Sequence, residues 1–232
     1  MGARMRAQGA ADRRRSFPQV PFRDYREIRE HVRTGDLLLC AGNSGLSRMI
    51  QRATRSPWSH VALVLRVESI DRVLVVESVE SVGVRAVPLT HYVGDAVTGR
   101  PGYDGELLIA RHRGVARLDD AHLRQVLRIA TDLLGREYDT REILRIAGRI
   151  LAGQRRGETL EDAPTPLRRD DAYICSEFVW ECLRAAEIEI AHDSRGFIAP
   201  CDFLADPSVE PLFRIQPHRE SASESFTGHP SD

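Results

Sequence analysis

The residue best placed for chemistry is Cys175, which follows Tyr173-Ile174 at the point where an extended stretch turns into a predicted helix. The first N–H groups of a helix lack partners within the helix, and together with the helix dipole they favour an anion. Such a position stabilises a thiolate, the nucleophilic form of cysteine, and can later hold an oxyanion. The alternative is that Cys175 is a small buried apolar residue, the usual environment of a lone cysteine.

His60 is the candidate partner for this thiol because it begins a β-rich run, SHVALVLRV. Strand alternation places His60, Ala62 and Val64 on one face. A histidine at a strand end can point into a cleft, accept a proton from a nucleophile and return it to a leaving group. The alternative is a hydrogen-bonded histidine at the edge of the core. The other seven histidines lie in predicted helices, loops or tails.

A histidine base needs an orienting partner on its second ring nitrogen, and two glutamates compete for this role. Glu77 and Glu80 both lie near the end of the run VLVVESVE, which is predicted to pair with the His60 strand. Since the register depends on the turn between the strands, geometry alone leaves both candidates open. Either carboxylate could instead be solvated at a strand end.

Three aromatic residues lie close in sequence to these positions or in a nearby motif. Trp58 precedes His60 by two residues, Tyr173 precedes Cys175 by two, and Tyr138 lies in the motif GREYD. They could form the wall of a substrate pocket, and core packing explains them equally well.

Other kinds of chemistry find little support. The chain contains no lysine, which excludes a Schiff base, and no His/Cys set has zinc-ligand spacing. The glycine-rich stretches lack the spacing of a phosphate loop. We therefore expect no cofactor and no metal. Asp36, in TGDLLL, is predicted to shape a turn.

Hydrophobic periodicity predicts the elements that carry these residues. Helices are predicted at 22–32, 46–53, 119–134, 140–152 and 176–186. Strands are predicted at 36–40, 59–67, 73–79, 82–89 and 106–111. The runs 59–67 and 73–79 are expected to form a hairpin through 68–72. Because helices and mainly antiparallel strands occur without regular alternation, the fold class is α+β.

Composition limits the kind of protein further. The chain has 232 residues, of which 42% are hydrophobic and 29% charged, with a net charge of −1. This length suits one domain, predicted at 19–215, between a disordered N-terminal tail at 1–18 and a flexible C-terminal tail at 216–232. The balanced charge gives no reason to expect nucleic acid as a partner. The oligomeric state is left open.

No apolar run resembles a secretory signal or approaches the length of a membrane span. We therefore predict a cytoplasmic protein without an integral membrane segment.

The four cysteines, Cys40, Cys175, Cys182 and Cys201, form no CxxC pair, and free thiols are expected.

Taken in order, these segments resemble a known family. RTGDLLL, SGLSRMIQRATRSPWSHVALV, VLVVES, LGREYD and YICSEFVWECL are similar to the circularly permuted branch of the NlpC-type papain-like cysteine peptidase superfamily. More narrowly, these segments resemble its YiiX-like (YebB-like) group. The resemblance covers roughly residues 33–183, with SHVALV and YICSE its most specific parts, and the histidine precedes the cysteine as in that branch.

The resemblance implies a papain-like core in which a small antiparallel sheet or barrel packs against helices. It matches Cys175 to the catalytic cysteine, His60 to the base and Glu77, rather than Glu80, to the acidic third member. It implies hydrolysis of an amide through a thioester acyl-enzyme, with a small amide, peptide or acyl substrate. Tyr138 matches a segment that could contribute to the pocket.

Two other functions stay open. One is a thiol acyltransferase acting on lipid-like acyl groups, as in the related lecithin retinol acyltransferase-like branch, which a large exposed apolar patch beside the cleft would favour. The other is a catalytically inactive binding module, which a wide separation of Cys175 and His60 would favour.

Overall fold

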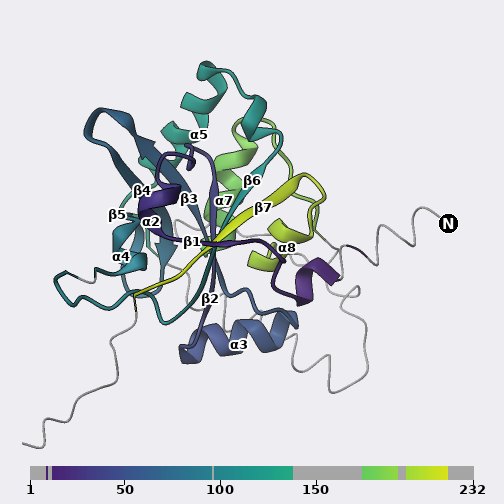
Figure 1. Ribbon diagram of the computed structural model, residues 1–232. Helices are drawn as coiled ribbons and strands as arrows, with labels where there is room; N and C mark the ends of the chain where they lie inside the picture. Colours follow the sequence, from purple (N-terminus) through teal and green to yellow (C-terminus); the bar gives the residue numbers. More distant parts are fainter. Residues whose placement is uncertain (1–8, 10–11, 96, 138–173, 193–196, 219–232) are drawn as a thin grey trace, which may run out of the picture.

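A seven-stranded mixed sheet forms the centre of the molecule in the computed structural model, which describes residues 9, 12–95, 97–137, 174–192 and 197–218 (Figure 1). The strands lie in the order β1-β7-β6-β2-β3-β4-β5, and only the β1-β7 pair is parallel. Their bounds are β1 Phe22–Arg23, β2 Leu37–Gly42, β3 His60–Val67, β4 Arg72–Val79, β5 Gly83–Pro88, β6 Gly105–His112 and β7 Val209–Ile215.

Short helices connect and cover these strands. The α-helices are α2 Tyr25–Ile28, α3 Gly45–Thr54, α4 Thr90–Val93, α5 Asp120–Asp132, α7 Cys175–Arg184 and α8 Pro200–Ala205. Two 3₁₀ turns are present as well, η1 Glu68–Ile70 and η2 Val115–Arg117. Asp119 caps α5 by accepting a hydrogen bond from the backbone N–H of His122, as an N-cap aspartate does.

The middle of the sheet is apolar on both faces, since all six residues of β2 are buried. Alternate residues of β2 and β3 therefore enter two different clusters of side chains. A buried carboxylate lies directly before β2. Asp36, 1% exposed, forms a salt bridge of 2.6 Å with Arg111 of β6 and accepts a hydrogen bond from the N–H of Arg33. Asp36 thus shapes the turn before β2, as predicted.

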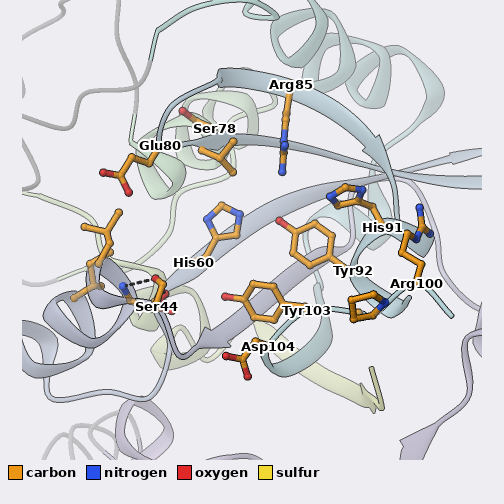
Figure 2. A pocket seen from close by; sticks show the side chains of 17 residues that line it. Ser44, His60, Ser78, Glu80, Arg85, His91, Tyr92, Arg100, Tyr103 and Asp104 are labelled. Carbon is orange, nitrogen blue, oxygen red and sulfur yellow. Dashed lines mark hydrogen bonds between the residues drawn. The ribbon is translucent and has the colours of Figure 1, made fainter. Parts of the chain in front are cut away.

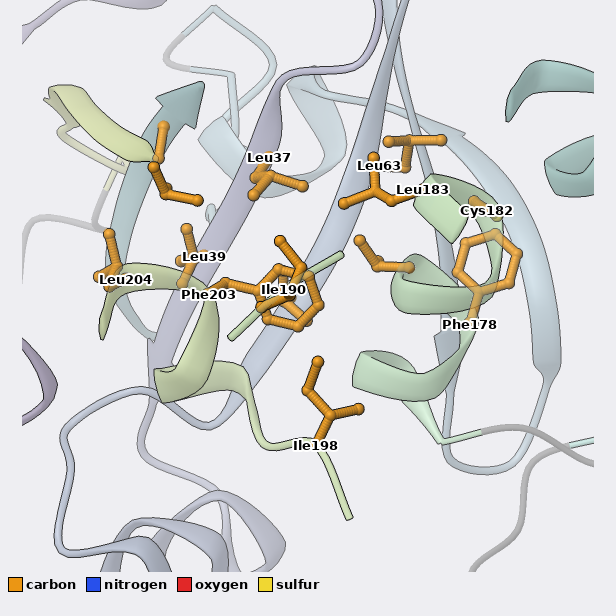
Figure 3. Close-up of a cluster of buried hydrophobic side chains, with 14 of the residues drawn as sticks. Leu37, Leu39, Leu63, Phe178, Cys182, Leu183, Ile190, Ile198, Phe203 and Leu204 are labelled. Atoms are coloured by element: carbon orange, nitrogen blue, oxygen red, sulfur yellow. The ribbon is translucent and has the colours of Figure 1, made fainter. Parts of the chain in front are cut away.

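The larger cluster lies between the sheet and helix α7 (Figure 3). Phe178 and Leu183 of α7 pack against the face of the sheet that carries Leu37 and Leu63, and all four are fully buried. Helix α5 packs in turn on α7. This packing fixes α7, and therefore its first residue Cys175, against strands β3 and β4.

The smaller cluster lies on the opposite face. Ala62 and Val64 of β3 contribute to it, together with Tyr92 of α4 and Ile28 of α2. His60 has the same parity along β3 as Ala62 and Val64, so the register places it at the edge of this second cluster.

The structure confirms the α+β fold class and the predicted hairpin, which is β3-β4 with η1 as its connection. The predicted helix at 22–32 is shorter, because its start forms strand β1 and α2 spans only four residues. Strand β7 and helices α4 and α8 were not predicted. Pro211 within β7 weakens a strand pattern, and β7 is accommodated next to β6 through an irregularity at Ile109/Ala110.

Residues 12–18, which were expected to belong to a disordered tail, contact the folded part. Arg14 forms a 2.6 Å salt bridge with the fully buried Asp202 of α8, and the ring of Phe17 packs edge-on against Trp58. At the other end, residues 216–218 follow β7, and the N–H of His218 donates to the carbonyl of Val93. Contacts of the described residues therefore reach beyond 19–215 at both ends.

Three further predictions concern the cysteines, a helix at 140–152 and membrane-spanning segments. All four cysteines are free and buried. The predicted helix at 140–152 lies outside the described residues. None of the helices in the described parts of the chain is long and apolar enough to cross a membrane.

Candidate active site

His60 stands at the first position of β3, and the residues before it fix the start of that strand. The N–H of Ser59 donates to the carbonyl of Cys40, and its hydroxyl accepts from the N–H of Gly42. The imidazole is mostly enclosed, since 15% of the His60 side chain is exposed. His60 is therefore held at the mouth of a cleft, with little freedom to reorient.

Glu77 of β4 is the partner of this histidine. Its side chain is fully buried, and its Oε2 lies 2.7 Å from His60 Nε2. A buried carboxylate that is ionised only accepts hydrogen bonds, so Nε2 carries the proton and donates it. The structure thus places Glu77 beside His60, whereas the side chain of Glu80 is exposed.

Two more donors hold the Glu77 carboxylate. The Tyr92 hydroxyl donates to Oε2, the same oxygen that accepts from His60. Arg85, which faces Glu77 across the β4-β5 pair, places Nε and Nη2 at 3.0 Å from Oε1. Both carboxylate oxygens are therefore bonded to groups that favour the charged form.

Cys175 approaches His60 from the other side. It is the first residue of α7, is 3% exposed, and its side chain hydrogen bonds with the imidazole. Because Nε2 is bonded to Glu77, Nδ1 is the nitrogen that faces the thiol. Ile174, at the N-cap, has no polar side-chain atom, so the cap position offers no side-chain acceptor to compete with an anion at Cys175.

Electrostatics favour an ion pair at this position. Burial lowers the pKa of His60, but the charge of the Cys175 thiolate, the hydrogen bonds to Cys175 and Glu77 and the Glu77 charge outweigh it and raise that pKa to about 10. Burial raises the pKa of Glu77, yet its hydrogen bond and charge interaction with His60, the Tyr92 hydroxyl and the Arg85 charge lower it overall. Burial raises the pKa of Tyr92, so this hydroxyl stays protonated as a donor. The arrangement suits a thiolate next to an imidazolium.

A cavity of about 540 Å³ opens beside His60 (Figure 2). Tyr92 and Tyr103 form part of its wall, with ring centroids 5.4 Å apart. The Tyr103 hydroxyl bonds to Ser47 and Ser59 and lies where a Cβ on Gly42 would be, which explains the glycine at that position. Ser44 and Ser78 add further hydroxyls. The volume fits a small organic molecule.

The aromatic residues predicted for substrate binding have different positions. Trp58 is fully buried in the larger core cluster, packs on Phe17 and is not one of the residues that line the cavity. A substrate role for Trp58 therefore gains no support from its position. Tyr138 and Tyr173 lie outside the described residues.

Sequence reasoning missed Tyr92 and Arg85. Arg85 could have been found from strand alternation, because a hairpin that pairs β4 with β5 brings it opposite Glu77. Tyr92 lies in the four-residue helix α4, whose sequence THYV has no periodicity that would identify a contact with β4. Within the described part of the chain, no group of three or more His, Cys, Asp or Glu residues could hold a metal ion.

Comparisons with known proteins agree with this geometry. The family described as "permuted papain-like amidase enzyme, YaeF/YiiX, C92 family" matches residues 31–143, which include His60 and Glu77 and end before Cys175. A crystal structure described as metalloprotein yiiX from Escherichia coli O157:H7 is similar in fold, with a TM-score of 0.54 and 18% identity over 80% of this chain and 98% of that chain. No curated protein matches the sequence.

Together, the fold and the family match define a papain-like cysteine hydrolase, of the amidase or peptidase type. Within that class, residues 31–143 match the circularly permuted YaeF/YiiX family, and the fold is similar to that of yiiX. The permutation explains why the strand with the histidine precedes the helix with the cysteine in this sequence.

Proposed function

We propose that the protein cleaves an amide bond through a thioester acyl-enzyme, with a Cys175–His60–Glu77 triad. One observation carries this proposal. The imidazole of His60 is bonded on one side to the buried carboxylate of Glu77, at 2.7 Å, and on the other side to the Cys175 side chain at a helix N-terminus. A nucleophile, a base and an orienting group in this order are the parts that acyl transfer needs.

In the first half-reaction, the Cys175 thiolate attacks the carbonyl carbon of the substrate and forms a carbon–sulfur bond. The carbonyl oxygen becomes an oxyanion, which the first N–H groups of α7 are placed to stabilise. His60 then gives its Nδ1 proton to the amide nitrogen. The carbon–nitrogen bond breaks, the amine leaves, and a thioester on Cys175 is left.

In the second half-reaction, neutral His60 takes a proton from water at Nδ1. The resulting hydroxide attacks the thioester carbonyl, and collapse of the intermediate releases a carboxylic acid and the Cys175 thiolate, with His60 again protonated. Throughout, Glu77 accepts a hydrogen bond from the N–H at Nε2 and fixes the imidazole in one orientation. Tyr92 and Arg85 keep Glu77 charged.

The substrate class consistent with the site is a small amide, peptide end or acyl compound bound in the cavity beside His60. Roles for Tyr138 and Tyr173 in binding remain predictions. Acyl transfer to a lipid would be favoured by an apolar surface at the cleft. The large hydrophobic side chains exposed in the described residues are Phe22, Ile70, Val82, Val97 and Leu134. None of these five lines the cavity, so hydrolysis is the better supported reaction.

The test uses p-nitrophenyl acetate, a small activated acyl donor that does not require knowledge of the natural substrate. We expect a burst of one p-nitrophenol per chain, and mass spectrometry should place one acetyl group on the peptide that carries Cys175. Cys175→Ala should abolish the burst. Cys201→Ala, a matched change at a fully buried cysteine in α8, should leave it intact.

A burst that survives in Cys175→Ala, or acetyl groups spread equally over the four cysteines, would contradict the assignment of the nucleophile. If the burst occurs but the acetyl group is released faster by an added alcohol or amine than by water, the enzyme is an acyltransferase rather than a hydrolase.

A further inference from the structure

We infer that the cavity beside His60 binds a carboxylate at one end, so that the substrate of the proposed hydrolase is an amide carrying a carboxylate a few bonds from the bond that is cut. This inference rests on the proposed function for its reaction. Its evidence is independent of the triad, because it comes from the distribution of charged side chains around the cavity.

Three cationic or ionisable side chains lie on one side of the cavity. They are Arg85 of β5, His91 of α4 and Arg100 of the loop that follows α4, and all three line the cavity. Figure 2 shows His91 and Arg100 beyond the ring of Tyr92 as seen from His60, and Arg85 between His60 and that ring. His91 and Arg100 thus bring donors for an anion to one end of the cavity.

These groups have different partners. Arg85 contacts the Glu77 carboxylate through Nε and Nη2, and this carboxylate balances its charge, so Arg100 supplies the positive charge at the far end. Arg100 donates to the carbonyl of Thr90 at 2.7 Å, an acceptor that carries no charge. The Asp95 carboxylate interacts with the charge of Arg100 and accepts the N–H of Val97 at 2.9 Å, but it does not line the cavity.

The carboxylates that line the cavity lie elsewhere. Figure 2 shows Glu80 on the opposite side of His60 from Arg100, and Asp104 below Tyr103. Asp104 accepts a hydrogen bond from the side chain of Asn43 at 2.9 Å. The cavity is therefore polarised, with positive charge at one end and negative charge near the other. A singly charged planar carboxylate fits this arrangement better than a phosphate, whose second charge Glu80 and Asp104 would repel.

The volume of the cavity and the position of His60 in its wall fit a compact substrate. The cavity holds about 540 Å³, which suits a molecule of the size of an acylated amino acid. His60 lines the cavity and contacts Cys175, so a carbonyl at the thiol would leave the rest of the molecule to run along the Tyr92 and Tyr103 rings toward Arg100. The scissile bond would then lie at His60 and the carboxylate at the cationic end.

The experiment compares two alkylating probes that differ by one charge, N-iodoacetylglycine and its neutral analogue N-iodoacetylglycinamide. The rate of modification of Cys175 is followed by mass spectrometry, and each rate is divided by the rate of the same probe with glutathione. This ratio removes the intrinsic reactivity of the probes. The folded wild-type chain should prefer the anionic probe by about 3- to 5-fold, the size expected for an ion pair exposed to solvent.

Variants of the cationic residues test whether the preference for the anionic probe arises at that end of the cavity. Arg100→Gln and His91→Gln should each reduce the preference toward unity, and added salt should do the same for the wild type. Arg124→Gln makes the same charge change on the exposed surface of α5 and should keep the preference. Arg85 is left unchanged because it also holds Glu77. Circular dichroism verifies folding, and the two independent variants protect against one that fails to fold.

The outcomes separate this inference from the proposed function. If both probes modify Cys175 rapidly with no preference for the anion, or if Arg124→Gln removes the preference as fully as Arg100→Gln does, the carboxylate site is refuted and the triad stands. If neither probe modifies Cys175 faster than a fully buried cysteine such as Cys201, the proposed function fails, and this inference fails with it.

Discussion

At the scale of single residues, the Glu77 carboxylate is the centre of the site. It is fully buried and accepts hydrogen bonds from His60, Tyr92 and Arg85. A buried charge with several partners is stable only as long as those partners remain. The orientation of His60, and through it the state of Cys175, therefore depends on two residues that never touch the thiol.

Tyr92→Phe tests this dependence, because it removes one hydroxyl and keeps the ring. The loss of a donor to Oε2 should raise the pKa of Glu77 and weaken its hold on the imidazolium. We expect the rate of Cys175 alkylation at pH 6 to fall by about 10-fold or more, as for the loss of one hydrogen bond to a charged group. The acid limb of the pH profile should move upward.

Tyr25→Phe is the control, since Tyr25 packs on the same face of the sheet but lies on α2. An unchanged pH profile in Tyr92→Phe, with both variants folded, would show that the tyrosine has no part in the electrostatics of the triad.

Sequence reasoning reached part of this network. The positions of Cys175 and His60 follow from local rules, namely a cysteine at a helix start and a histidine at a strand start. The choice between Glu77 and Glu80 did not follow, because strand register is set by a turn whose conformation the sequence leaves open. The role of Tyr92 could not be predicted for a different reason, since its contact with Glu77 joins α4 to β4 and depends on tertiary packing.

At the scale of secondary structure, the sheet holds the two halves of the site in place. Strands β3 and β4 bring His60 and Glu77 to one face, and α7 packs on the other face while its first turn reaches the end of β3. Strand β5 then adds Arg85 opposite Glu77. The start of β5 is in turn bonded to the segment after α5, where Val84 exchanges two hydrogen bonds with Gly135 and Arg136.

Gly83→Ala tests the close backbone contact at the start of β5. Gly83 has φ of +81°, and a Cβ there would lie 2.0 Å from the carbonyl oxygen of Arg136. Since neither the conformation nor the contact tolerates a side chain, we expect the free energy of unfolding to fall by about 2 kcal/mol or more. Urea denaturation measures it.

Gly45→Ala is the matched control. A Cβ at Gly45 meets nothing within 4 Å, and the residue is the first of helix α3. This variant should be neutral or slightly stabilising. Equal destabilisation by the two substitutions would contradict the description of the β5 edge.

At the scale of the whole molecule, the N-terminal segment is part of the folded domain. Arg14 pairs with Asp202 of α8, Phe17 packs on Trp58, and β1 pairs with β7 at the edge of the sheet. The first strand therefore completes an edge whose neighbour comes from the other end of the chain.

Arg14→Gln should destabilise the protein, because the fully buried Asp202 carboxylate would lose its charged partner. The expected cost is about 3 kcal/mol, measured by thermal and urea unfolding. Arg15→Gln, at an exposed neighbouring position, should change stability by less than about 0.5 kcal/mol. If the two variants have the same stability, the N-terminal segment does not contribute to the fold in the way the contacts indicate.

Most strands and helices of the sheet and its cover could be predicted from the sequence. The features that could not be predicted depend on contacts between residues far apart in the chain. The continuous apolar runs of β2, β3 and β4 and the amphipathic pattern of α5 and α7 identify these elements from local sequence. The N-terminal segment is rich in arginine and poor in apolar residues, so composition indicated disorder. Its order depends on Asp202 and Trp58, which are far away in the sequence, and no local pattern reports such contacts.

The central claim is that Cys175 and His60 form a thiolate–imidazolium pair. The most direct test is the rate of iodoacetamide labelling at Cys175 as a function of pH, in the wild type and in His60→Ala. Because the pKa of His60 is raised to about 10, the imidazolium persists through neutral pH, and the wild type should label well below pH 7. In His60→Ala, labelling below pH 7 should be lost, as expected when the thiol has no imidazolium partner. If Cys175 labels no faster than Cys40 or Cys201, and His60→Ala changes nothing, the account is contradicted.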